Sequence, residues 1–212
     1  RQLEKLGEEQ GITDKNVVKE LTEFAIVQQA RELAKKDDFD GLVKLYDDQP
    51  SLNHRTNESI SKQQYSTPAP IGYLMGKFVG LGTAKNALEP SAGNGMLTIA
   101  GDPKIFTVNE IDDTRLANLK KQGFGEIISQ DGSKPFETGI IYDAVVTNPP
   151  FGGTNAVEFD GYKINELAQI MTIRALDVMK DNGKAAIIIG GNNKFDDAGR
   201  LTGRDRIFFN YL

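Results

Sequence analysis

The chain has 212 residues and a formal net charge of −5, and its 39% apolar and 26% charged residues suit a globular protein in water. The absence of cysteine excludes a disulfide framework and a cysteine-based zinc site. The negative charge argues mildly against a chain that grips duplex DNA on its own, because such binding usually depends on a basic surface.

No apolar run approaches the roughly 18 residues that a membrane-spanning helix needs. The amino-terminal end is charged and shows no signal peptide. We therefore expect a cytoplasmic protein that has no membrane partner.

Residues 1–60 are predicted to form a helical extension without identifiable chemistry. Thr13 or Asp14 can cap a first helix that runs to about Lys36 and whose predicted apolar stripe includes Leu21, Ala25 and Leu33. A shorter helix follows before Pro50. The only histidine of the chain, His54, has no partner at a metal-ligand spacing. We therefore predict that it is a loop residue and that the chain has no metal site.

A helix is also predicted from Thr67-Pro68 to Gly80 or Gly82. Thr67 would be its N-cap and Pro68 its first residue, since these are the positions that threonine and proline favour. The free N–H groups at the start of such a helix could bind a carboxylate.

Four successive predicted strands each end in a polar side chain. These side chains are Glu89, Glu110, Asp131 and Asn148. In an open α/β sheet, ligands bind at the carboxyl ends of the strands, so the four residues are expected to converge on one site.

The loop after Glu89 contains Gly93 and Gly95, which permit close approach of the backbone to a ligand, and a helix is predicted after Gly95. The loop lacks the Lys-Ser/Thr pair of a phosphate-binding loop and the three-glycine spacing of a dinucleotide site. Glu89 would repel a phosphate but could hold an amino group. Glu110 is placed to accept hydrogen bonds from ribose hydroxyls, and Asp131 could accept one from the amino group of an adenine.

The segment after the fourth strand reads Asn148-Pro149-Pro150-Phe151. Two consecutive prolines hold φ near about −65° and remove two N–H donors, which makes a stiff turn. The side-chain oxygen of Asn148 and the carbonyl of Pro149 could then accept both hydrogens of an exocyclic NH2 group, while Phe151 stacks on the attached ring.

Beyond this segment we predict a mobile polar loop over residues 152–162 and a helix over about 164–180 that ends at Asn182-Gly183. A fifth buried strand is predicted over residues 185–189. An apolar segment begins near Arg206.

Over residues 61–195 these motifs resemble the class I S-adenosylmethionine-dependent methyltransferases. The order of the motifs, with Asn-Pro-Pro-Phe last, is similar to that of the γ group of N6-adenine DNA methyltransferases, which includes the type I modification subunits. The resemblance implies that the catalytic residues are Asn148, Pro149, Pro150 and Phe151. It implies that the cofactor S-adenosylmethionine is bound by Tyr65, Thr67, Glu89, Pro90, Ser91, Ala92, Gly93, Gly95, Glu110, Ile111, Asp131, Gly132 and Asn148.

The fold that the resemblance implies is a Rossmann-like α/β domain over residues 61–212. Its sheet would be mostly parallel, with strand order 3-2-1-4-5 and helices on both faces. The family sheet has two further strands that form a final hairpin, and we predict that this hairpin is missing here. We therefore expect an excerpt of a longer protein that binds cofactor poorly and methylates nothing by itself.

The activity that the resemblance implies is transfer of a methyl group from S-adenosylmethionine to the N6 amine of a flipped-out adenine in DNA. The expected partners are DNA and a specificity or target-recognition domain outside this chain. One alternative is a protein glutamine N5- or ribosomal RNA guanine N2-methyltransferase, but the segment Tyr65–Pro68 favours the DNA enzymes. Another is a non-catalytic DNA-binding module with the same fold, against which the intact Asn148 and Phe151 argue.

Overall fold

The computed structural model describes residues 2–50, 66–190 and 194–212. The predictions for His54 and Tyr65 lie outside these ranges. No helix in the described ranges is both long enough and apolar enough to cross a lipid bilayer.

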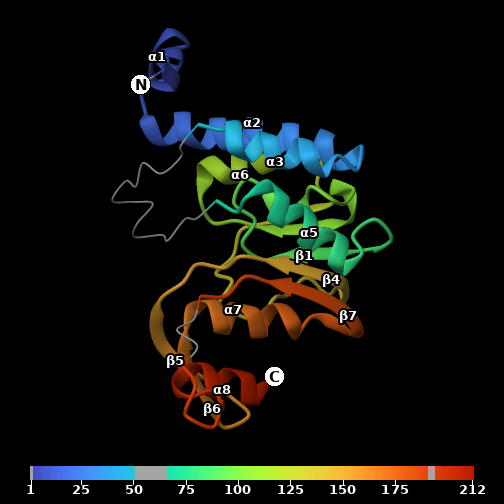
Figure 1. Cartoon of the computed structure of the whole chain (residues 1–212), viewed down its shortest axis with the longest axis vertical. Coiled ribbons are helices and arrows are strands. Elements are labelled where there is room, and N and C mark those ends of the chain that lie inside the picture. Colours follow the sequence, from blue (N-terminus) through green and yellow to red (C-terminus); the bar gives the residue numbers. More distant parts are fainter. Residues whose placement is uncertain (1, 51–65, 191–193) are drawn as a thin grey trace.

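The centre of the molecule is a five-stranded parallel sheet (Figure 1). Its strands, in spatial order, are β3 (Glu126–Ile128), β2 (Phe106–Asn109), β1 (Ala87–Glu89), β4 (Tyr142–Thr147) and β7 (Met179–Ile187). The predicted order 3-2-1-4-5 is confirmed, with β7 as the fifth parallel strand.

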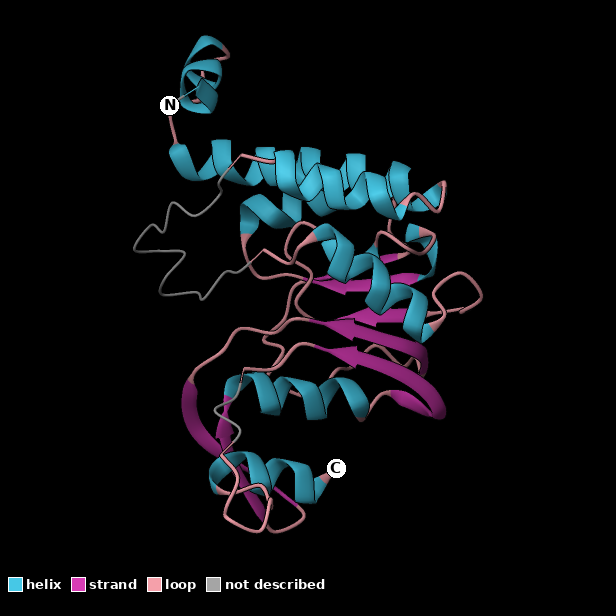
Figure 2. Cartoon of the chain, viewed as in Figure 1, coloured by secondary structure: helices cyan, strands magenta, loops and turns pink. Residues whose placement is uncertain are grey.

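Helices cover both faces of this sheet (Figure 2). Ala87 and Val146 face one side and pack with Val79 at the end of α5 (Ala69–Val79). Their neighbours Leu88 and Val145 face the other side and pack with Ala175 of α7 (Leu167–Leu176). This alternation is what a strand buried on both faces requires.

The amino-terminal helices are α1 (Gln2–Glu9), α2 (Lys15–Lys35) and α3 (Phe39–Asp48). Asp14 caps α2, as predicted, and its carboxylate accepts hydrogen bonds from the N–H groups of Asn16 and Val17. Helix α2 packs against α6 (Asp113–Leu119), and α3 packs against α5 (Figure 1). Apolar residues of α2 and α3 share one core cluster with α5, so the extension is packed onto the sheet domain. The predicted division at residue 60 stays a prediction.

Two helix predictions are corrected. Helix α5 begins at Ala69, and its N-cap is Pro68, which offers no side-chain cap. The hydroxyl of Thr67 instead accepts a hydrogen bond from Asn148. The helix predicted after Gly95 is one 3₁₀ turn over Met96–Thr98, and Gly101 and Pro103, which are poor helix formers, follow it closely.

The polar loop predicted over residues 152–162 is wrong. Strands β5 (Gly153–Phe159) and β6 (Tyr162–Glu166) form an antiparallel hairpin there. Its turn, Asp160-Gly161, has positive φ at both residues, which is the conformation that an Asp-Gly hairpin turn favours.

This hairpin is a separate two-stranded sheet between β4 and α7, so it does not extend the main sheet. Because residues 162–166 pair with β5, α7 starts later than predicted. The dipeptide Asn182-Gly183 lies inside β7, where the pairing register with β4 shifts, and does not end a helix. The last segment forms α8 (Gly203–Tyr211), which packs on the hairpin at the end of the molecule opposite α1 (Figure 1).

Close packing of α5 gives a testable prediction. A Cβ on Gly72 would lie 2.8 Å from the carbonyl oxygen of Met96, a backbone atom of the 3₁₀ turn. We expect Gly72→Ala to lower the free energy of unfolding by about 1–3 kcal/mol, because helix and turn must separate. Urea unfolding followed by circular dichroism measures the change.

The matched control is Gly82→Ala, since a Cβ at Gly82 meets no described atom within 4 Å. This control should change the free energy of unfolding by less than about 0.5 kcal/mol. Equal unfolding midpoints for the two variants would contradict the packing described here.

Candidate functional site

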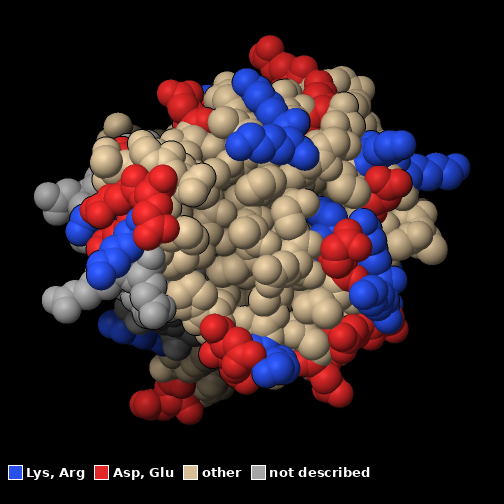
Figure 3. Space-filling model, turned by 90° about the horizontal axis from the view of Figure 1, so that it is seen from above, with Lys and Arg blue, Asp and Glu red and all other residues tan. Residues whose placement is uncertain are grey.

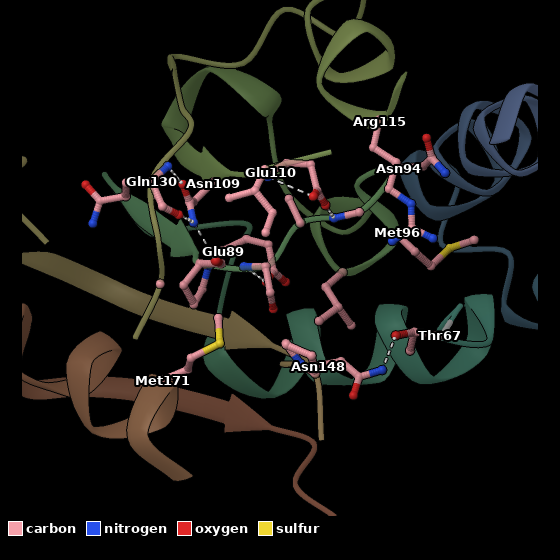
Figure 4. A pocket seen from close by; sticks show the side chains of 18 of the residues that line it. Thr67, Glu89, Asn94, Met96, Asn109, Glu110, Arg115, Gln130, Asn148 and Met171 are labelled. Atoms are coloured by element: carbon pink, nitrogen blue, oxygen red, sulfur yellow. Dashed lines mark hydrogen bonds between the residues drawn. The ribbon is translucent and has the colours of Figure 1, made fainter. Parts of the chain in front are cut away.

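A cavity of about 260 Å³ opens at the carboxyl ends of β1, β2, β3 and β4. Most residues that the sequence predicts for the site line it: Thr67, Glu89, Pro90, Ser91, Ala92, Gly93, Glu110, Ile111, Asp131, Gly132, Asn148 and Pro150. Figure 4 shows Gln130 at one end of this space and Thr67, Asn94 and Arg115 toward the other. The cavity is therefore elongated across the strand ends.

Three residues predicted for the site do not line the cavity, and a fourth, Tyr65, is outside the described residues. Gly95 shapes the loop with a φ of 94°, and Pro149 is buried behind Asn148 and Pro150. The ring of Phe151 lies against Gly190, where an added Cβ would be 3.0 Å from the ring. A side chain at that position would have to displace the ring by a few tenths of an ångström.

Glu110 holds the glycine-containing loop in place. One carboxylate oxygen accepts hydrogen bonds from the N–H groups of Ile111 and Asp112, both at 2.8 Å. The other accepts from the N–H of Gly93 at 2.9 Å. A carboxylate offers about four acceptor positions, so one remains for a ligand hydroxyl.

Glu89 lies at the tip of β1 and is only 1% exposed. Its Oε1 accepts hydrogen bonds from the N–H and the hydroxyl of Ser91 at 3.0 and 3.3 Å. Its Oε2 is buried and meets no donor among the described residues. Burial raises the pKa of Glu89 to about 8, against the opposing hydrogen bonds of Ser91 and Thr147, so the carboxyl group is protonated at neutral pH.

Asn109 is a structural residue of the site that the sequence analysis missed. Its side-chain amide donates to the carbonyl oxygens of Pro90 and Gln130, both at 3.0 Å, and accepts from the N–H of Gln130 at 2.8 Å. These bonds tie together the ends of β1, β2 and β3 (Figure 4). The only signal in the sequence is one amide directly before Glu110.

Asp131 and Gly132 follow β3 at the edge of the cavity. The Oδ1 of Asp131 accepts from the hydroxyl and the N–H of Ser133 at 2.7 and 2.9 Å, and these bonds lower the pKa of the carboxyl group. Gly132 is buried, and a Cβ there would lie 2.6 Å from the Met171 methyl group. Asp131 is thus an ionised acceptor beside a backbone that passes close to α7.

Asn148 is oriented by Thr67. Its Nδ2 donates a hydrogen bond of 3.1 Å to the hydroxyl oxygen of Thr67, as Figure 4 shows. Its Oδ1 is buried and has no donor within the part of the chain that the structure describes. Thr67 therefore fixes the amide with an acceptor left over at the cavity.

The amino-terminal helix α2 also reaches this cavity, which the sequence analysis did not predict. The buried carboxylate of Glu20 accepts hydrogen bonds of 2.8 Å from Asn94 and Arg115. Arg31 donates to the carbonyl and the hydroxyl of Thr98 at 3.0 and 2.7 Å. Glu23, on the same face of α2, lines the cavity itself.

Part of the predicted apolar stripe of α2 is wrong, since Ala25 is exposed. The buried face includes Glu20, Glu23 and Arg31. It carries charged groups because it packs on the polar loop after β1. Within the described ranges, no group of three or more Asp, Glu or His side chains is placed to hold a metal ion.

No protein-family model and no curated protein matches the chain. Among solved structures, TrmN from Thermus thermophilus is similar over 59% of this chain and 39% of its own, with 13% identity and a TM-score of 0.46. PH1948 from Pyrococcus horikoshii, provisionally assigned as an RNA methyltransferase, is similar over 66% of this chain and 67% of its own, with 18% identity and a TM-score of 0.45.

The glycopeptide N-methyltransferase MtfA, in complex with sinefungin, is similar over 58% of this chain and 50% of its own, with 14% identity and a TM-score of 0.40. The chain thus spans half of MtfA and about two fifths of TrmN. Since these identities and TM-scores are low, we base no functional conclusion on the likenesses.

The buried carboxyl of Glu89 gives a prediction about stability and pH. Below about pH 4.5 the group is protonated in both the folded and the unfolded chain, so its ionisation does not affect the free energy of unfolding. As the pH rises toward 8 the unfolded chain loses the proton and the folded chain keeps it. The free energy of unfolding therefore falls by up to about 5 kcal/mol.

We therefore expect Glu89→Gln, which cannot ionise, to raise the melting temperature increasingly from about pH 5 to pH 9. Glu137→Gln, at an exposed position, is the control and should leave the profile unchanged. A difference between Glu89→Gln and the original chain that does not grow with pH would contradict the burial of this carboxyl.

Proposed function

We propose that the cavity binds S-adenosylmethionine and that the chain transfers its methyl group to the N6 amine of an adenine extruded from DNA. The observation that carries the proposal is the side chain of Asn148. Its amide is anchored to Thr67 at 3.1 Å, and its Oδ1 is buried without a donor. A buried acceptor of this kind suits a ligand that brings an N–H group.

The residues present fit this cofactor. Three residues that line the cavity, Glu23, Glu89 and Asn148, each carry a buried oxygen atom without a donor among the described residues, and two of these are carboxyl oxygens. Such a set suits a ligand with a positive charge and several donors. Asp131 and Ile111 would hold the adenine, Glu110 the ribose, and Glu89 with Thr67 the amino-acid end.

When bound, S-adenosylmethionine supplies a methyl group that is activated by a positively charged sulfur. The chain contributes position and polarity at the accepting nitrogen. Asn148 Oδ1 and the Pro149 carbonyl would accept the two amine hydrogens, which shifts the nitrogen toward tetrahedral geometry and frees its lone pair. The new N–C bond forms as the S–C bond breaks, and the nitrogen then releases one proton to water.

The target ring would stack on Phe151, since an adenine must leave the duplex to enter such a site. The Phe151 ring in turn packs against Gly190.

The distribution of charged side chains on the surface affects how strongly the chain can bind DNA. On the face shown in Figure 3, Lys and Arg are interspersed with Asp and Glu, and no broad basic area is visible among the described residues. The net charge of the chain is −5. DNA binding that neutralises phosphates needs a concentration of basic groups. We therefore propose that a specificity or target-recognition domain outside this chain supplies most of the affinity for DNA.

The direct test is transfer of a tritiated methyl group to an oligonucleotide with one adenine opposite an abasic site. This adenine is already unpaired, so the assay requires little of a separate recognition domain. Label on it would overturn the expectation from the sequence that the chain methylates nothing by itself. We expect the label on adenine N6 and at least a 10²-fold loss, roughly, with Asn148→Ala, which removes the acceptor.

The same oligonucleotide with cytosine in place of adenine is the control and should stay unlabelled. Ribosomal RNA and a release factor are tested in parallel, since guanine N2 and glutamine N5 are the alternative acceptors. Label only in RNA or only in protein, equal rates for Asn148→Ala, or no label in any substrate would contradict the proposal.

The bond between Thr67 and Asn148 gives a separate prediction. Thr67→Val keeps the shape of the side chain and removes the acceptor of the 3.1 Å hydrogen bond. The amide can then rotate, so we expect methyl transfer to fall by about 10- to 100-fold. Thr67→Ser retains the hydroxyl and should restore most of the rate, and a Val variant as active as the original would show that this bond has no positioning role.

A further inference from the structure

Glu23 stands out among the residues of the amino-terminal helix α2. Its side chain lines the cavity although it is separated by more than sixty positions from the strand-end residues that form the rest of the site. The residue is 5% exposed, and its Oε2 is buried without a donor in the described part of the chain. A carboxylate in this state is costly for a folded protein unless a partner arrives.

Arg115 meets this need only in part, as an ion pair without a hydrogen bond. Its guanidinium donates to Glu20 at 2.8 and 3.3 Å, and its nearest approach to Glu23 is 4.0 Å, beyond hydrogen-bond length. Lys19 also lies toward Glu20, at 3.8 Å. Burial raises the pKa of Glu23, and the negative charge of Glu20 adds to this, while the positive charges of Arg115 and Lys19 and a hydrogen bond with the Ser66 side chain oppose it.

The position of Glu23 along the cavity follows from its neighbours. The proposed adenosine contacts, Asp131 and Glu110, come from the ends of β3 and β2. Arg115 lies toward the other end, near Asn94 and Thr67 (Figure 4), and Glu23 is within 4.0 Å of Arg115. An extended ligand with its adenine over β3 would therefore place its amino-acid end beside Glu23.

The helix that carries Glu23 is held firmly on the sheet domain. Arg31 anchors it to the 3₁₀ turn, and Glu20 anchors it to Asn94 in the loop after β1. Its apolar residues Val27 and Ala30 are fully buried in the cluster shared with α5. Glu23 is thus preorganised toward the cavity before any ligand binds.

We infer that Glu23 accepts a charge-assisted hydrogen bond from the ammonium group at the amino-acid end of the cofactor, so that α2 is part of the cofactor site. This inference rests on the proposed function and extends it to a helix that sequence reasoning left without chemistry. An ammonium has three donors, so it can serve Glu23 and a second acceptor such as Glu89 together.

The test compares two ligands that differ only beyond the adenosine thioether. S-adenosylhomocysteine carries the amino-acid end, and 5′-methylthioadenosine lacks it. We expect Glu23→Gln to weaken binding of S-adenosylhomocysteine by about 10- to 100-fold, as for loss of a hydrogen bond between charged groups. Affinity for 5′-methylthioadenosine should change by less than about 2-fold, and isothermal titration measures both.

Glu32→Gln is the matched control, because Glu32 lies on the same helix and pairs at the surface with Lys35. It should leave both affinities unchanged. Glu23→Asp keeps the charge but shortens the side chain by one methylene. It should therefore weaken binding of S-adenosylhomocysteine by less than Glu23→Gln does, again without changing the affinity for 5′-methylthioadenosine. Retained binding of 5′-methylthioadenosine shows in each variant that the site is folded.

The possible outcomes distinguish a failure of the proposed function from a failure of the inference about Glu23. If the original chain binds neither ligand, the proposed function fails. If it binds both and Glu23→Gln weakens both equally, or neither, the inference about Glu23 fails while the proposed function stands. If Glu23→Gln does not fold, Glu23→Asp decides by the same comparison.

Discussion

A buried oxygen atom without a hydrogen-bond donor costs a folded chain about 1–3 kcal/mol, and more when the atom belongs to a charged group. Within the part of the chain that the structure describes, Glu23, Glu89 and Asn148 each carry such an atom, and all three residues line one cavity. A chain that only had to fold would gain stability by replacing them with apolar residues. Two of these residues lie at strand ends and one lies on α2, and their meeting at one cavity suits a ligand that carries donors and positive charge.

The remaining polar groups of the site explain why these three oxygens stay unpaired. Asn109 uses both of its N–H donors and one acceptor position to join three strand ends, and Glu110 uses most of its acceptor positions on backbone N–H groups. Arg115 is committed to Glu20. The engaged donors of Asn109 and Arg115 are thus fixed on other partners, as in a preorganised site.

The sequence predicted the four polar strand ends, because strand periodicity and the Gly and Pro residues between strands depend on local chemistry. The order of the strands in the sheet was expected only from the family resemblance. The sequence could not show that the hydroxyl of Thr67 bonds Asn148 and does not cap α5, since a hydroxyl serves either role. The hairpin β5–β6 was hidden in a polar stretch, although its Asp160-Gly161 turn was a usable signal. Glu20 and Glu23 were missed because apolar periodicity assigns acids to the surface, whereas here the surface of the neighbouring loop is polar.

The most direct test of the central claim is the number of protons released when S-adenosylmethionine binds, measured by calorimetry at neutral pH in two buffers of different ionisation enthalpy. Glu89 is protonated in the free chain because burial raises its pKa to about 8. A cation entering the cavity should drive its ionisation, so we predict saturable binding with release of roughly one proton, which Glu89→Gln reduces. Absence of saturable binding, or binding with no proton release, would contradict the account.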